Sequence, residues 1–170
     1  MPRFTNVAAQ AATVVEERSL AACYLDETLN LYHEEHRYLR SATWSCPSLA
    51  GQFELNHYPF AQADHIDYVT ASMIMVYLSQ LGFVYTRVLC EEHILPFTHE
   101  EFFRLRDEGR IVFSRFHDIR FNDKIYISEG EMVLRMSIDR LLSAAGRFIG
   151  EVDFAAGNAR CMGRARVAII

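Results

Sequence analysis

The chain has 170 residues, of which 51% are hydrophobic, and its formal net charge is −5. This length and apolar content suffice to bury a core without disulfide or metal staples, which predicts a single domain over residues 1–170. The acidic balance excludes the basic footprint that nucleic acids and anionic membrane surfaces attract, so neither is an expected partner.

The first third of the chain is predicted to contain one helix and a pair of strands. Apolar residues recur at helical spacing over residues 15–32, which indicates an amphipathic helix that covers one edge of a sheet. Aliphatic and aromatic residues at 37–46 and 51–58 predict two strands. In the second of these, Phe53 and Leu55 are expected to share the inward face.

An uncharged run occupies the middle of the chain. Its nineteen residues, from Tyr68 to Thr86, approach the length that crosses a bilayer. Several tyrosines and polar side chains lie within it, and no cluster of positive charge marks one end. We therefore expect a helix buried in protein and no membrane partner. Asp64 is the expected N-cap and Asp67 the capping-box residue, and the helix is expected to end near Val88.

A shorter helix and a run of strands are predicted after the central helix. Thr98 followed by Glu101 predicts a capping box, and Gly109 is the expected stop. Beyond it the periodicity changes to the alternation typical of strands, and Gly157-Asn158 is a tight hairpin signal. The predicted strands span residues 111–117, 124–138, 148–155 and 159–170, with a turn or bulge at 141–146.

This order of elements predicts the fold class. Strands and helices are segregated along the chain, which indicates an α+β domain. A strongly curved antiparallel sheet wrapped around one long central helix is the hotdog fold, and this is the arrangement that we expect. One protomer of such a fold leaves a sheet edge partly covered, so a homodimer with sites at its interface is also expected.

The cysteines and the N-terminal residues indicate the cellular compartment that we expect for this protein. Cys23, Cys46, Cys90 and Cys161 form no C-x-x-C pair and have no histidine at zinc-ligand spacing, so no metal or redox motif is predicted. The N-terminal residues lack the apolar segment of a secretory signal, and a cytoplasmic protein with reduced thiols is expected.

Ionisable residues gather in front of the central helix, in the segment Asp64-His65-Ile66-Asp67-Tyr68. The first amides of a helix lack intrahelical partners and can hold a carbonyl oxygen that becomes negative. That oxygen belongs either to the oxyanion of thioester hydrolysis or to the enolate of addition to an unsaturated thioester. His65 titrates near neutrality, and Asp67 can orient an imidazole or act as a base. Alternatively, both aspartates serve only as caps and His65 is structural.

Three other groups of residues are also candidates for a functional site. His57-Tyr58-Pro59 is similar to the His-Phe-Pro of hotdog dehydratases, but Ala71 stands where those enzymes have a carboxylate, which argues against dehydration. The ionisable residues 32–36 suit a metal or an acid–base pair, or else a solvated helix end. Three cations lie near the later strands: Arg115, Arg120 and Lys124. They can bind a carboxylate or the phosphate of phosphopantetheine. Alternatively, they serve only to keep the surface soluble.

Short segments in a consistent order resemble the FcoT-like hotdog family, and the likeness spans most of residues 29–170. The segments are Arg37-Tyr38-Leu39, Gly51-Gln52-Phe53-Glu54-Leu55, His65-Ile66-Asp67, Gln80-Leu81, Ser114-Arg115-Phe116, Asn122, Lys124, and the last strand from Gly157 through Gly163 to Ala168.

Members of this family are described as long-chain acyl thioesterases and, in natural-product clusters, as enoyl-acyl-carrier-protein glycyltransferases. The resemblance therefore implies conjugate addition of glycine to a (2E)-enoyl thioester on acyl carrier protein or coenzyme A, which gives an N-carboxymethyl β-amino acid. A plain acyl thioesterase is one alternative, and a non-catalytic acyl-binding hotdog protein is another. None of these activities needs a cofactor.

The resemblance also implies site residues. The family has Gly-His-Phe-Asn where this chain has Asp64 to Asp67, so His65 carries over and Asp67 replaces a functional asparagine. One functional tyrosine matches Tyr32 with one residue of gap, and another falls at Tyr58 or Phe60. The expected catalytic residues are His65, Asp67, Tyr58 and Tyr32. The expected substrate-binding residues are Asp64, Arg37, Arg115, Phe60 and Tyr68, with Arg115 or Arg37 on the glycine carboxylate.

Overall fold

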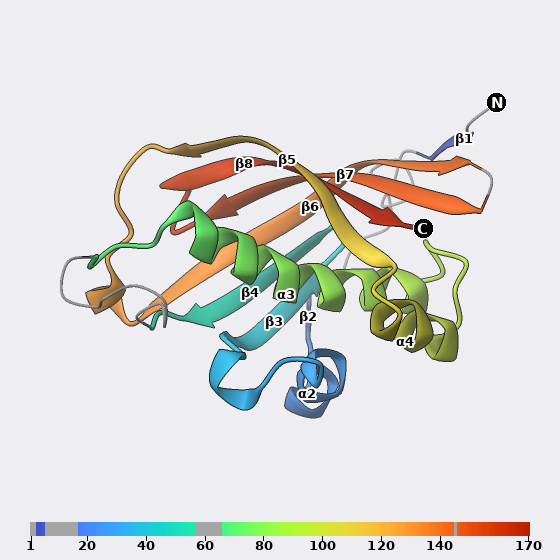
Figure 1. Ribbon diagram of the computed structural model, residues 1–170, viewed down its shortest axis with the longest axis horizontal. Helices are drawn as coiled ribbons and strands as arrows, with labels where there is room; N and C mark the ends of the chain where they lie inside the picture. Colours follow the sequence, from blue (N-terminus) through green and yellow to red (C-terminus); the bar gives the residue numbers. More distant parts are fainter. Residues whose placement is uncertain (1–2, 6–16, 57–65, 145) are drawn as a thin grey trace.

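The computed structural model describes residues 3–5, 17–56, 66–144 and 146–170. In this part of the chain the strands form one antiparallel sheet, and the long helix α3 packs against it (Figure 1), which confirms the expected α+β class. The helices are α2 (Ala22–Leu29), α3 (Ala71–Glu91) and α4 (His99–Asp107), with short 3-10 helices η1 (Glu34–His36) and η3 (Ile127–Glu129). The strands are β1 (Arg3–Thr5), β2 (Arg18–Ser19), β3 (Leu39–Ser45), β4 (Ser48–Glu54), β5 (Ile111–Phe121), β6 (Glu131–Ala144), β7 (Arg147–Ala156) and β8 (Cys161–Ile169).

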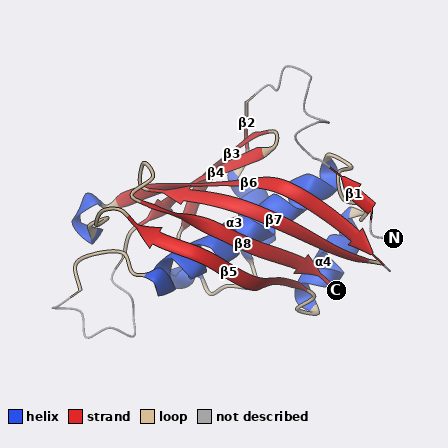
Figure 2. Ribbon diagram, turned by 90° about the horizontal axis from the view of Figure 1, so that it is seen from above, coloured by secondary structure: helices blue, strands red, loops and turns tan. Residues whose placement is uncertain are grey.

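The sheet joins the early hairpin to the late strands through β6. Its order is β2-β3-β4-β6-β7-β8-β5, and β1 pairs with β6 off this path. At the centre, Gly51 of β4 and Ala156 of β7 both lie opposite Leu134 of β6. β5 ends the path, so one of its edges has no partner strand in the described part of the chain. Figure 2 shows this strand beside α3 along one border of the sheet.

The core lies between the sheet and α3. Phe53 is fully buried and Leu55 is buried beside it, as the alternation predicts. Among the described helices, α3 has the length and apolar composition of a membrane span, but 78% of its most apolar window is buried inside the protein. The prediction of a helix buried in protein is therefore confirmed. Its buried apolar side chains are Met73, Ile74, Tyr77, Leu78, Leu81, Val84, Tyr85, Val88, Leu89 and Cys90.

The start of α3 differs from the prediction. The helix begins at Ala71, and Thr70 is its N-cap, with the Thr70 hydroxyl accepting a hydrogen bond from the Met73 amide at 3.4 Å. Asp64 is therefore not the cap and Asp67 is not in the first turn, so the predicted capping box is wrong. The helix also continues past Val88 to Glu91.

A backbone pairing explains why the helix starts late. The Val69 amide donates to the Ile125 carbonyl at 2.8 Å, and the Ile127 amide donates to the Asp67 carbonyl at 2.7 Å. Tyr68 forms an antiparallel bridge with Tyr126 between these two bonds. These bonds hold the segment in front of α3 extended, and Thr70, a residue type that favours N-caps, then begins the helix.

Other boundaries are partly as predicted. The helix expected over residues 15–32 covers only Ala22–Leu29, because residues 18–19 pair with β3 as β2. The strand expected from residue 124 begins at residue 131, after η3, and it continues through residues 141–144, where a turn was expected. The capping box of Thr98 and Glu101 is confirmed. The hairpin at Gly157 is also confirmed, since Gly157 has a φ of +55° between β7 and β8.

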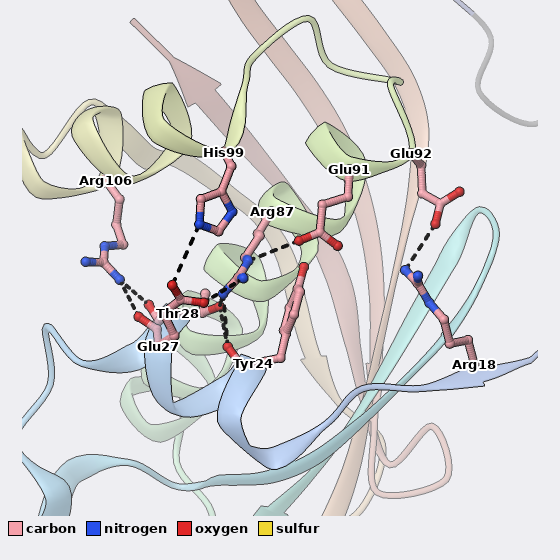
Figure 3. A network of polar contacts seen from close by, with 9 residues as sticks. All are labelled: Arg18, Tyr24, Glu27, Thr28, Arg87, Glu91, Glu92, His99 and Arg106. Carbon is pink, nitrogen blue, oxygen red and sulfur yellow. Dashed lines mark hydrogen bonds and ion pairs between the residues drawn. The ribbon is translucent and has the colours of Figure 1, made fainter.

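A buried arginine fastens α2 to α3. The Arg87 guanidinium lies 3.8 Å from the centre of the Tyr24 ring and donates to the Thr28 hydroxyl at 2.8 Å (Figure 3). It also forms ion pairs with Glu27 at 2.7 Å and with Glu91 at 3.2 Å. The Arg87 side chain is only 7% exposed, so these groups replace the water that the guanidinium loses.

A second arginine extends this network to α4. One Arg106 nitrogen donates to the backbone carbonyls of Glu27 and Thr28 at 2.9 and 2.8 Å. These carbonyls belong to the last turn of α2 and lack intrahelical partners, so a cation there satisfies them and complements the helix dipole. Phe103 of α4 lies under both guanidinium groups. The network therefore holds α2 and α4 against the C-terminal half of α3.

We predict that Arg87→Met lowers the free energy of unfolding by about 3 kcal/mol, because it removes a buried charge that several groups are arranged to bind. Urea denaturation of the purified protein measures this change. The matched control is Arg18→Met, which removes the exposed Arg18–Glu92 pair and is expected to cost less than about 1 kcal/mol. Equal costs for the two variants would contradict a fastening role for Arg87.

Candidate functional site

An apolar groove opens between α3 and the edge strand β5, and we call it the α3–β5 groove. Its volume is about 320 Å³, which lies in the range of ligand-binding clefts. Ser79 is the polar side chain among its described lining residues. The lining residues are Met75, Ser79, Gly82, Phe83, Ile111, Val112, Phe113, Phe116 and Val167.

Helical periodicity and a strand irregularity direct these residues to the groove. Met75, Ser79 and Gly82 follow the spacing of one helix face. On β5, residues three positions apart normally point to opposite faces of the sheet. A register shift after Phe113 breaks this alternation, so Phe113 and Phe116 both line the groove with their rings stacked at 5.3 Å.

Tyr32 reaches the same helix face from the segment after α2. Its hydroxyl lies 3.0 Å from the Ser79 hydroxyl, and either oxygen can donate. Its ring packs edge-on against Phe83, with ring centres 6.4 Å apart. Burial raises the pKa of Tyr32, and the hydrogen bond with Ser79 offsets part of this effect. The result is a neutral hydroxyl pair beside an apolar groove.

Gln80 fixes the segment that follows Tyr32. Its side chain is fully buried, and its amide nitrogen donates to the His36 carbonyl at 2.6 Å. Its amide oxygen accepts from the Tyr38 and Leu39 amides at 3.0 and 3.1 Å. One helix side chain therefore satisfies two buried backbone amides and one part-buried carbonyl, and it anchors the start of β3 to α3.

Arg37 completes the attachment of this segment. Its Nε donates to the Tyr32 carbonyl at 3.0 Å, and the residue is half-buried. Arg37 therefore lies next to Tyr32, as a shared site requires, but its Nε binds backbone. In the same segment, the ionisable residues of η1 are not part of any group of three or more His, Cys, Asp and Glu side chains placed to hold a metal ion in the described ranges.

A second hollow lies where the chain enters α3, and we call it the Tyr68 hollow. Its volume is about 260 Å³, and it is lined by Tyr68, Val69, Phe121, Asp123 and Lys124. The Lys124 ammonium lies 5.0 Å from the centre of the Tyr68 ring, a cation–π distance. Asp67 immediately precedes this wall and its side chain is exposed.

The groove and the hollow follow one another along the same pair of elements. α3 and β5 run in opposite directions (Figure 1), so the end of β5 lies near the start of α3. Phe113 faces Gly82 in the middle of the helix, and Phe121 reaches Tyr68 before it. A ligand bound along this line would meet an aromatic hollow with a lysine first and an apolar groove next.

The remaining predicted site residues have different locations. Arg115 is exposed on β5 and is not among the groove's lining residues. Asp64, His65, Tyr58 and Phe60 lie outside the described residues. Sequence reasoning missed Ser79, although its spacing from Met75 and Gly82 was a readable signal of a shared helix face.

Comparison with protein-family models finds no matching family, and comparison with curated proteins finds no match.

We predict that Gln80→Leu destabilises the protein by about 3 kcal/mol, because it leaves two buried backbone amides and one part-buried carbonyl without their partner. Chemical denaturation followed by circular dichroism measures the loss. Gln52→Leu is the control: Gln52 bonds to exposed Ser41 and Glu131 side chains, and its replacement is expected to cost less than about 1 kcal/mol. A Gln80 variant as stable as the control would show that this attachment is not needed.

Proposed function

We propose that this protein is an enzyme of the FcoT-like hotdog family that acts on acyl thioesters. The observation that carries the proposal is an apolar groove along the central helix with a neutral hydroxyl pair at its wall. Burial of an acyl chain in such a groove is favourable by about 0.8 kcal/mol for each methylene group. A long helix packed against an antiparallel sheet is compatible with the hotdog fold.

The proposed reaction is addition of glycine to a (2E)-enoyl thioester on an acyl carrier protein. The glycine nitrogen forms a bond to the β-carbon while the carbon–carbon π pair moves toward the thioester oxygen, which becomes an enolate. After the bond forms, the nitrogen carries an extra proton; loss of that proton and protonation of the enolate at the α-carbon balance, and they give the N-carboxymethyl β-amino acyl thioester. The glycine ammonium must first lose a proton, and Asp67 or His65 is the proposed acceptor.

The start of α3 supplies the proposed site for the enolate oxygen. Since Thr70 is the cap, the amides that lack intrahelical acceptors are those of Ala71 and Ser72. Helix-start amides aimed at a developing negative charge lower the barrier by electrostatic stabilisation. Asp67 precedes these amides by four residues and lies beside the Tyr68 hollow.

The Tyr68 hollow is the proposed place for the carrier's phosphopantetheine arm. Lys124 offers a cation for its phosphate, and Tyr68 and Phe121 offer aromatic surface for the arm. In this proposal the acyl portion extends along α3 into the α3–β5 groove. The thioester then lies between the Tyr68 hollow and the groove.

Hydrolysis of the thioester is the second candidate, and one observation favours it. No arginine or lysine is among the described residues that line the groove, and Arg37 binds a backbone carbonyl through its Nε. Glycine needs a cation for its carboxylate, whereas water does not.

We predict that the purified protein, given a (2E)-enoyl thioester of acyl carrier protein and glycine, forms a product heavier by one glycine, detected by mass spectrometry. Asp67→Asn is expected to slow this reaction by about 100-fold or more, because an amide cannot accept the proton. Asp139→Asn, an exposed aspartate on β6, is the matched control and should retain activity.

The other outcomes separate the alternatives. Release of free thiol from saturated acyl thioesters in the absence of glycine would indicate that the protein is a thioesterase and not a glycine-adding enzyme. Full activity of Asp67→Asn would remove the base role from Asp67. No turnover of any thioester, together with fatty-acid binding, would indicate a non-catalytic acyl-binding protein.

We also propose a homodimer, because one edge of β5 has no partner strand among the described residues and two such edges can pair about a twofold axis. Light scattering after size exclusion should then give twice the chain mass of 19.6 kDa. A mass of one chain at micromolar concentration would contradict this arrangement.

A further inference from the structure

A small inner cavity lies behind the α3–β5 groove. It is lined by the C-terminal half of α3, by Leu95 and by strands β6, β7 and β8, and its volume is about 20 Å³. That is room for about one water-sized group. Gly82 and Val167 line both the inner cavity and the groove, so the two spaces meet at these residues.

An aromatic ring narrows the meeting point on the groove side. A Cβ atom added to Gly82 would lie 2.6 and 2.8 Å from two ring carbons of Phe113. Phe113 lines the groove but not the inner cavity. Glycine at position 82 therefore allows the ring to lie against the helix backbone, at the boundary between the two spaces.

The inner cavity offers nothing to a polar ligand. Two hydroxyl side chains are among its lining residues, and both are already engaged. The Thr86 hydroxyl donates to the Gly82 carbonyl at 2.8 Å. The Tyr85 hydroxyl donates to the Pro47 carbonyl and accepts from the Ile138 amide at 2.9 Å. A space with satisfied polar groups and apolar walls favours an alkyl group over water.

We propose that the contact between Gly82 and Phe113 sets the length of the acyl chain that the protein accepts. The chain lies in the α3–β5 groove and its terminal methyl group passes the Phe113 ring into the inner cavity. With the ring in place, the cavity ends the chain after about one carbon group. This inference rests on the proposed function, since it requires an acyl ligand in the groove.

The test measures binding rather than turnover. Straight-chain fatty acids from hexanoate to hexadecanoate are titrated into the purified protein by calorimetry, which gives the chain length of tightest binding. Gly150→Ala places a methyl group in the inner cavity, 3.7 Å from Ile138, an ordinary packing distance. This variant is expected to leave short chains unaffected and to weaken the longest bound chain by about fourfold for each methylene group that loses burial.

Substitutions of Gly82 and of Phe113 should shift the chain length of tightest binding in opposite directions. Phe113→Leu is expected to lengthen the preferred chain, because the smaller side chain opens the boundary. Gly82→Ala is expected to shorten it, and the double variant Gly82→Ala/Phe113→Leu should restore it in part, since the clash is with the Phe113 ring. Val133→Ala, at an exposed position on β6, is the control that should change nothing.

The results distinguish the two proposals. If the wild-type protein binds fatty acids and Gly150→Ala and Phe113→Leu keep its chain-length preference, the inner cavity does not measure the chain and this inference is overturned. If the wild-type protein binds no fatty acid of any length, the acyl ligand is wrong and the proposed function falls with it.

Discussion

Burial of α3 is the constraint on which the rest of the structure depends. A helix of 21 residues that is apolar on most faces must be covered on most faces, and the sheet, α2 and α4 provide this cover. Two polar side chains inside the contact, Gln80 and Arg87, bind backbone or charged groups of the covering segments. They convert a non-directional attraction into one fixed arrangement, because each would be left unsatisfied if its segment shifted.

The cover is incomplete along one stripe, and this stripe contains the candidate site. β5 ends the sheet, so the helix face that carries Met75, Ser79 and Gly82 meets one strand whose outer edge has no partner strand in the described part of the chain. Glycine at position 82 lets that strand approach closely, and the bulge after Phe113 directs two aromatic rings to the same side. The groove is thus a consequence of where the sheet stops and not of a separate binding element.

Local signals in the sequence predicted local features well. The uncharged run predicted a buried helix because its burial depends on composition, and Thr98 with Glu101 predicted a capping box because both partners lie within one turn. The start of α3 was predicted wrongly because the backbone hydrogen bonds that hold the preceding segment extended come from Ile125 and Ile127, which are distant in the sequence. The pairing of Tyr32 with Ser79, 47 positions apart, likewise depends on the tertiary fold. A strand bulge has no sequence signature here, so the shared side of Phe113 and Phe116 was not predictable.

The electrostatics of the groove separate the proposed site of proton transfer from the proposed site of the alkyl chain. Burial raises the pKa of Tyr32, so at neutral pH its hydroxyl stays protonated and does not act as a base. Ser79, its partner, has no titration near neutrality either. A proton acceptor must therefore come from outside the apolar groove, where water or a cation can stabilise its charge. Asp67, exposed beside the Tyr68 hollow and ahead of the α3 amides, meets that condition. This separation favours a thioester held at the start of α3, with its reactive carbons toward Asp67 and its alkyl chain toward Ser79.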